Sequence, residues 1–115
     1  MLNITERQTN DATILKLEGN IIMGGGSKKL GDAVRRLLEK NRKNIVLNFS
    51  AVKYLDSSGV GELISLSQEI DEVDGNLRLS NLSQKVEDVL TLSSVLPLFE
   101  IYSDDEDALN FSAAN

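Results

Sequence analysis

The chain has 115 residues, of which 41% are hydrophobic and 26% charged, with a formal net charge of -6 and neither cysteine nor histidine. These numbers suit one domain spanning residues 1–115 with a single core, and they exclude disulfides, thiolate metal sites, a cysteine nucleophile and a Ser-His-Asp triad. The acidic balance argues against a nucleic-acid partner. No apolar run reaches membrane-spanning length and no signal-peptide layout is present, so a cytoplasmic location without membrane contact is expected.

The N-terminal segment predicts a β-hairpin. Leu2–Thr5 and Ala12–Leu17 have strand composition, with a turn signal between them. Gly19 and Asn20 are expected to end the second strand. Ile21–Ser27, with three successive glycines, is then an exposed loop whose Ser27 caps the following helix.

The middle of the chain predicts a helix, a buried strand and a second helix. Apolar residues recur at helical spacing from Leu30 to Leu38. Asn44–Phe49 is apolar on consecutive residues, which is typical of a strand covered on both faces. Asp56 is a plausible N-cap for a helix that runs to about Val73.

The C-terminal part predicts two short strands, each followed by a helix. The predicted features are a strand around Leu77 and Leu79, a helix starting at Ser83, a break at Pro97, a strand Leu98–Ile101, and a capping box Ser103–Glu106 before a helix Ala108–Phe111. The order is β-β-α-β-α-β-α-β-α. It predicts an α/β fold with a mixed sheet that is parallel in its later part.

The strongest candidate site is the run from Tyr54 to Gly61, which contains Asp56, Ser57 and Ser58. A helix start exposes free N–H groups and the positive end of the helix dipole, which suit a phosphate or a partner's polar group. Asp and Ser also favour the N-cap position whatever the function, so a purely structural cap is the alternative. The functional hypothesis is a phosphorylation switch, because a phosphate adds about -1.5 to -2 charge and would repel a partner.

Three other features favour structural explanations. Gly24–Ser27 lacks the spacing of a Walker loop, and no βαβ unit is predicted around it, so a tight turn is preferred over nucleotide binding. The acidic run Asp104–Asp107 suits a helix N-terminus better than a metal site. Basic residues cluster on one predicted helix and just beyond it, either as its solvated side or as a docking patch for an acidic partner. These basic residues are Lys28, Lys29, Arg35, Arg36, Lys40, Arg42 and Lys43.

The central segment resembles the signature of bacterial anti-sigma factor antagonists, which belong to the STAS domain family. The resemblance rests on Ile45–Phe49, Val52–Leu55 and Asp56–Leu63. It extends to the opening hairpin, Gly19, Asn81–Ser83, Val86, Val89 and Leu90. It therefore covers nearly the whole chain and implies the STAS fold, a small mixed sheet packed on helices.

The resemblance implies partner switching rather than enzymatic activity. In that scheme the unphosphorylated antagonist binds an anti-sigma factor, often a serine kinase of the histidine-kinase-like ATPase type, which then releases its sigma factor. The kinase phosphorylates the serine directly after the aspartate, Ser57 here, and a serine phosphatase removes the phosphate. Asp56 would help position the hydroxyl. Because the kinase supplies ATP, no cofactor is expected on this chain.

One loop departs from the family pattern. After Gly19 many members carry an acidic residue, a hydrophobe and an Asp, followed by Thr or Ser-Ala, whereas this chain has Asn20–Gly26. The partner is thus expected to differ from the usual kinase, either as a relative that needs no phosphorylation or through a different regulatory output. The predicted partner-binding residues lie on this loop, the helix start and the exposed side of the helix. They are Met23, Gly24, Gly25, Gly26, Ser27, Asp56, Ser58, Gly59, Glu62, Ser65 and Glu69.

Two alternatives belong to other classes. A phosphotransfer receiver domain with Asp56 as the acceptor would need an acidic pair at the end of the first strand, where this chain has polar, unpaired residues. A STAS scaffold, with assembly rather than sigma release as its output, stays open.

Overall fold

The computed structural model describes residues 1–114, and the order of its strands and helices confirms the predicted one. The elements are β1 (Leu2–Gln8), β2 (Thr13–Ile21), α1 (Gly26–Glu39), β3 (Asn44–Leu55), α2 (Ser57–Glu72), β4 (Asn76–Ser80), α3 (Gln84–Leu92), the short 3-10 helix η1 (Leu96–Leu98), β5 (Glu100–Tyr102) and α4 (Asp105–Ala114).

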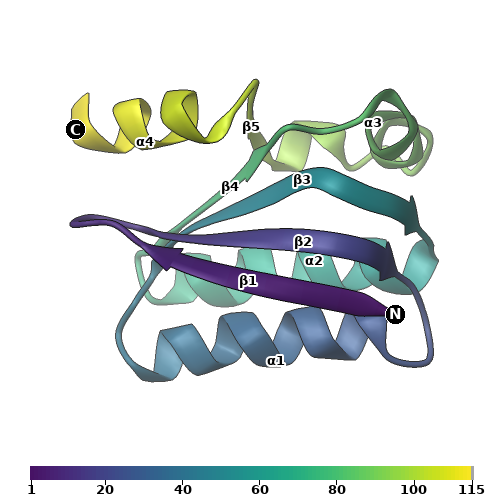
Figure 1. Ribbon diagram of the computed structural model, residues 1–115, viewed down its shortest axis with the longest axis horizontal. Helices are drawn as coiled ribbons and strands as arrows, with labels where there is room; N and C mark the ends of the chain where they lie inside the picture. Colours follow the sequence, from purple (N-terminus) through teal and green to yellow (C-terminus); the bar gives the residue numbers. More distant parts are fainter. Residues whose placement is uncertain (115) are drawn as a thin grey trace.

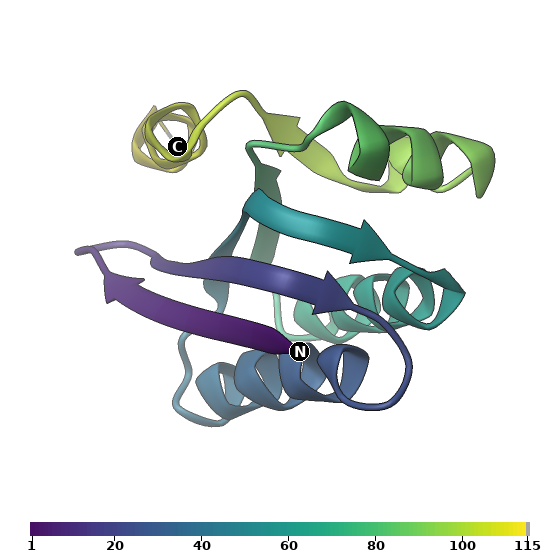
Figure 2. The same ribbon diagram turned by 45° about the vertical axis from the view of Figure 1, so that its right-hand side comes forward.

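The strands form a five-stranded sheet in the order β1-β2-β3-β4-β5. The β1–β2 pair is antiparallel and the other three pairs are parallel, as the sequence predicts. Helices α1 and α2 lie side by side under the sheet in Figure 1, and α3 and α4 lie above β3 in that view. Figure 2 shows the twist of the sheet, which turns β4 well away from the direction of β1. Because β2 and β3 are parallel neighbours, their carboxyl ends bring the starts of α1 and α2 to the same edge.

The core alternates across the central strand, as expected for a strand covered on both faces. Ile45, Leu47 and Phe49 are fully buried in the large cluster, which also takes side chains from α1, α2 and α3. Val46 points to the other face, where it packs with Ile14 and Ala108 of α4. Each such side chain contributes roughly 1.5–3 kcal/mol of hydrophobic stabilisation.

Both central strands extend further than the sequence predicted. β2 continues past Gly19 to Ile21 through an irregular register, and β3 continues past Phe49 to Leu55. Ile21 is fully buried, so it does not belong to an exposed loop. The reason is that each strand completes the hydrogen-bond ladder of the other, which overrides the weak strand propensity of Gly19 and Asn20.

The predicted cap at Ser27 is wrong. Helix α1 starts at Gly26, two residues before the start that a cap at Ser27 implies, and Gly25 occupies the N-cap position without a side-chain hydrogen bond. Ser27 lies inside the first turn and is buried. In contrast, the predicted caps Asp56 and Ser83 are confirmed, since each accepts a hydrogen bond from a backbone N–H in the first turn of its helix.

The C-terminal boundaries also differ from the prediction. The last strand covers Glu100–Tyr102, because Leu98 belongs to η1, where Pro97 occupies an early position that needs no N–H donor. Helix α4 begins at Asp105 rather than Ala108. The Asp104 carboxylate accepts a hydrogen bond from the Asp107 N–H at 2.9 Å, in place of the predicted capping box.

Candidate functional site

Asp56 connects three segments at the edge where β2 and β3 end. Its Oδ1 accepts hydrogen bonds from the Gly59 N–H at 3.1 Å and the Ser58 hydroxyl at 2.6 Å, and its Oδ2 accepts one from the Met23 N–H at 3.0 Å. These donors, the Ser58 hydroxyl foremost, lower the pKa of Asp56 to about 2. The carboxylate is therefore ionised at neutral pH, and both of its oxygens are engaged in holding the helix start and the glycine loop.

The neighbouring serines have different environments. The Ser58 hydroxyl donates its one proton to Asp56, so Ser27 must be the donor in the 2.7 Å contact between the Ser27 and Ser58 hydroxyls. This chain of hydrogen bonds joins the first turns of α1 and α2. Ser57 is exposed as the first residue of α2, and its hydroxyl makes no hydrogen bond with any described residue. Of the two serines after Asp56, Ser57 is the one free to react.

Two glycines allow both helix starts to approach the end of β2. A Cβ at Gly26 would lie 2.1 Å from the carbonyl oxygen of Asn20, and one at Gly59 would lie 2.4 Å from that of Ile21. Both distances are far below van der Waals contact. Gly26 and Gly59 are buried and position the site, so they present no side chain to a partner.

The glycine loop joins the strand and the helix of a βαβ unit, which was not predicted from the sequence. Because β2 and β3 are parallel and α1 connects them, β2-α1-β3 is a βαβ unit, and the expectation that none surrounds the loop is wrong. The missing Gly-Lys-Ser/Thr spacing still separates the loop from a Walker motif. Gly24 has a φ of +96°, which agrees with the predicted tight turn.

Only part of the predicted loop surface is exposed. Met23 is 76% exposed and Gly24 and Gly25 are exposed, whereas Gly26 and Ser27 are buried. Beside them lies a shallow hollow of about 340 Å³. Its lining includes Met1, Leu2, Ile22, Met23 and the glycines. Apart from Lys29 the lining carries no charged side chain, so the loop presents a mainly apolar, open surface.

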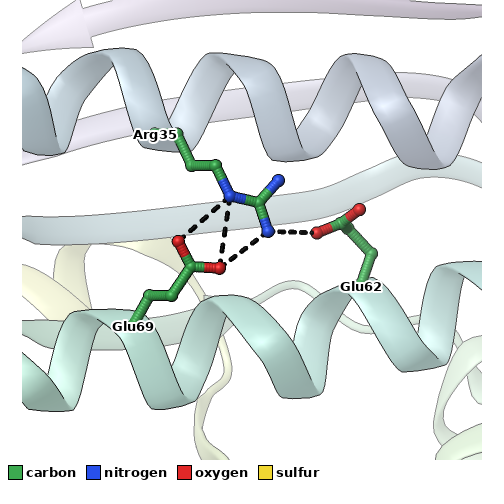
Figure 3. Close-up of polar contacts among 3 residues, drawn as sticks. All are labelled: Arg35, Glu62 and Glu69. Atoms are coloured by element: carbon green, nitrogen blue, oxygen red, sulfur yellow. Dashed lines mark hydrogen bonds and ion pairs between the residues drawn. The ribbon is translucent and has the colours of Figure 1, made fainter.

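Two of the residues predicted to face a partner from α2, Glu62 and Glu69, are bound instead by Arg35 of α1 (Figure 3). Arg35 Nη2 lies 2.8 Å from Glu62 Oε2 and 2.7 Å from Glu69 Oε2, and Arg35 Nε donates to both Glu69 oxygens. The hydrogen bonds to Glu69, more than the one to Glu62, raise the pKa of Arg35. The bonds from Arg35 in turn lower the pKa of Glu69. Glu62 and Glu69 thus face α1 rather than standing free for a partner.

The exposed stripe that continues from Ser57 along α2 contains Gly61, Ser65 and Gln68. Their spacing of i, i+4, i+8 and i+11 places them on one side of a helix. Of the predicted partner-binding residues on α2, only Ser65 lies there. The sequence analysis missed Gln68, which the same spacing counted from Ser57 would have found.

No cluster of three or more Asp, Glu, His or Cys side chains within the described part of the chain could hold a metal ion. The carboxylates of the acidic run diverge: Asp105 accepts hydrogen bonds from Ser80 and Asn48 on the sheet, whereas Asp107 accepts one from Ser103. No described helix has the length and apolar character needed to cross a membrane.

Comparison with known proteins identifies the family. The family model of the STAS domain matches residues 3–108. The chain belongs to the STAS domain family. A curated relative, BtrV of Bordetella bronchiseptica, assigned as an anti-sigma factor antagonist, is 22% identical over 93% of this chain and 91% of its own length.

Solved structures show the same fold. The unphosphorylated anti-sigma factor antagonist SpoIIAA superposes with a TM-score of 0.82 at 21% identity, covering 98% of each chain. The phosphorylated form of SpoIIAA, from Bacillus, gives a TM-score of 0.73 at 20% identity, covering 96% of this chain and 99% of its own. TM1081 of Thermotoga maritima gives 0.81 at 26% identity, with 93% and 92% covered. This STAS domain is therefore similar, along nearly all of its length, to the anti-sigma factor antagonist class.

Proposed function

We propose that this STAS domain is an anti-sigma factor antagonist whose binding to an anti-sigma factor is ended by phosphorylation of Ser57. The observation that carries the proposal is the contrast between the two serines after Asp56. Ser57 is exposed at the start of α2, whereas the Ser58 hydroxyl is held by Asp56 and Ser27. A relative solved in both unphosphorylated and phosphorylated forms supports this kind of switch.

The physical effect of a phosphate at Ser57 is a change of surface charge. The phosphate adds about -1.5 to -2 charge beside Asp56, which is already ionised. The first-turn N–H groups and the helix dipole tolerate that charge, so the fold is retained. A partner that fits the unmodified surface meets a strongly negative helix start after phosphorylation and dissociates.

The proposed contact surface combines the exposed loop with one side of α2. Its members are Met23, Gly24, Gly25, Ser57, Gly61, Ser65 and Gln68, all exposed. The bond from the Met23 N–H to Asp56 holds the loop against the helix start, so both parts are presented together. Gly26, Ser27, Ser58 and Gly59 act beneath this surface by positioning it. Glu62 and Glu69 contribute through their bonds to Arg35.

The partner in this proposal is an anti-sigma factor with a histidine-kinase-like ATPase domain, opposed by a serine phosphatase. The role places the chain in the cytoplasm, which the lack of cysteine favours. No cofactor belongs to the proposal.

The test is affinity capture from native cells with wild type, Ser57→Ala and Ser57→Asp, alongside site mapping of the endogenous protein. We expect wild type and Ser57→Ala to enrich such an ATPase, and Ser57→Asp to lose it. Ser50→Asp adds the same charge at an exposed position on β3 and should bind like wild type. Equal capture by all four proteins would refute the gating.

The scaffold alternative predicts a different outcome. An unmodified Ser57 under several growth conditions, together with recovery of a large homomeric assembly, would favour a STAS module that organises other regulators. The geometry does not favour a receiver domain with Asp56 as the phosphate acceptor, because both Asp56 oxygens already accept structural hydrogen bonds.

A further inference from the structure

β1 is an edge strand whose outer side is unpaired within the described sheet. The bonds just beyond its two ends fix which residues face outward. The Asn20 N–H donates to Met1 and the Thr9 N–H donates to Ala12, at 3.1 and 2.8 Å, so odd-numbered residues of β1 bond to β2. In an antiparallel ladder the intervening residues direct their N–H and C=O groups away from the partner. Ile4 and Glu6 therefore present backbone donors and acceptors to the open edge.

A groove of about 380 Å³ runs between this edge and α1. Its floor is apolar, formed by Ile4, Leu15, Ala33 and Leu37. Its α1 side carries four cations, Lys28, Lys29, Arg36 and Lys40, against the carboxylates of Glu6 and Asp32. Lys28 is paired with Asp32 at 2.7 Å. Lys29, Arg36 and Lys40 are exposed and have no ion-pair partner among the described residues. In a chain of net charge -6, this is a local surplus of positive charge.

The spacing of these cations suits an extended chain. At about 1.5 Å rise per residue, Arg36 and Lys40 lie about 6 Å apart along α1, and Lys29 lies about 10 Å before Arg36. Alternate side chains of a strand repeat at about 6.7 Å. A strand added to β1 would place every second side chain over α1, in step with Arg36 and Lys40.

We propose that the β1 edge and the basic side of α1 bind an extended acidic segment of a partner protein as an added strand. Backbone bonds to Ile4 and Glu6 would set its register, and its carboxylates would meet Lys29, Arg36 and Lys40. The groove adjoins the proposed contact surface at Gly25 but does not include Ser57, and the proposal does not rest on phosphorylation of that serine. A second copy of the chain fits less well, because a two-fold β1–β1 contact would bring two basic α1 flanks together.

The test uses a dye-labelled short peptide of alternating glutamate and valine, followed by fluorescence anisotropy. We expect saturable binding that Arg36→Glu/Lys40→Glu weakens by about tenfold or more, since charges beside an interface set its electrostatic fit. The control Lys16→Glu/Lys53→Glu makes the same charge change at exposed sites on β2 and β3 and should bind like wild type. Equal weakening by the two double variants would overturn the proposal.

The backbone part is tested at Glu6. Glu6→Pro removes an outward N–H without breaking a bond to β2, so binding should be lost, whereas Glu6→Gln removes a repulsive carboxylate and should bind at least as tightly. Of two peptides, one N-methylated at the glutamates and one at the valines, one should fail on the wild-type protein, because only alternate N–H groups of an added strand face β1. This comparison covers the case of a misfolded proline variant. Undiminished binding of both N-methylated peptides, no saturation at millimolar peptide, or self-association that Glu6→Pro abolishes would each overturn the proposal.

Discussion

Gly59 and Gly61 stand two residues apart in α2, yet alanine at the two positions should change stability in opposite directions. Gly61 is exposed, and a Cβ there meets no atom within 4 Å. Replacing glycine by alanine within a helix then stabilises the protein by about 0.5–1 kcal/mol, because the unfolded chain loses freedom. Gly61→Ala should raise the free energy of unfolding by that amount.

At Gly59 the same gain is overcome by a clash. The new Cβ would lie 2.4 Å from the Ile21 carbonyl oxygen and 2.5 Å from Leu55 Cδ1. The Leu55 side chain can move, but the Ile21 oxygen is backbone and accepts the Asp56 N–H at 3.3 Å. Overpacking of this kind costs about 1–3 kcal/mol, and displacement of the end of β2 adds to it. We therefore expect a net loss of about 1–3 kcal/mol for Gly59→Ala.

The assay is urea unfolding followed by circular dichroism, with both variants fitted beside wild type. At about 4–6 °C per kcal/mol for a chain of this size, thermal midpoints should also move apart by several degrees. If Gly59→Ala proves as stabilising as Gly61→Ala, then α2 does not pack against the end of β2 as described, and the geometry of the site is wrong.

Three further predictions concern single side chains. Arg35 links α1 to α2 through partly exposed ion pairs, so Arg35→Ala should lower the free energy of unfolding by about 1 kcal/mol in low salt and by less at about 1 M salt. An unchanged urea midpoint would contradict this. The folded-state pKa of Asp56 is about 2, below the unfolded value of about 3.9, so its stabilising effect is present above about pH 4 and is lost as the pH falls toward 2. Asp56→Asn should accordingly flatten the acid limb of the stability profile, and an unchanged limb would argue against the capping role. Asp105→Ala removes the hydrogen-bond acceptor of two buried side chains, Asn48 and Ser80. It should lower the free energy of unfolding by about 1–3 kcal/mol and speed amide hydrogen exchange in α4. Amides of α4 that stay protected would exclude this role for Asp105.

The features that the sequence predicted correctly depend on local signals. The strand at Ile45–Phe49 begins with three consecutive apolar residues, Ile45–Leu47, and the caps at Asp56 and Ser83 precede helices of clear periodicity. Such patterns follow from the period of one element and from the chemistry of one helix end. They were enough to give the order of elements and the position of the candidate site.

The features that the sequence missed depend on contacts between elements. Helical spacing shows that Glu62 and Glu69 lie off the core side of α2, but not that α1 lies close enough for Arg35 to bind them. Likewise, the three consecutive glycines indicate a turn, whereas the close approach that requires Gly26 comes from the Asn20 carbonyl of the neighbouring strand. Neither contact has a signature within one segment.

The arrangement around Asp56 separates the roles of the adjacent hydroxyls. Ser58, Met23 and Gly59 engage both oxygens of the carboxylate, so the helix start and the loop are held together within the folded chain. A charge added at Ser57 would then cause little structural rearrangement. It changes the electrostatic potential of a surface whose shape is already set, which is what a reversible block on binding needs, because both states must keep the same fold.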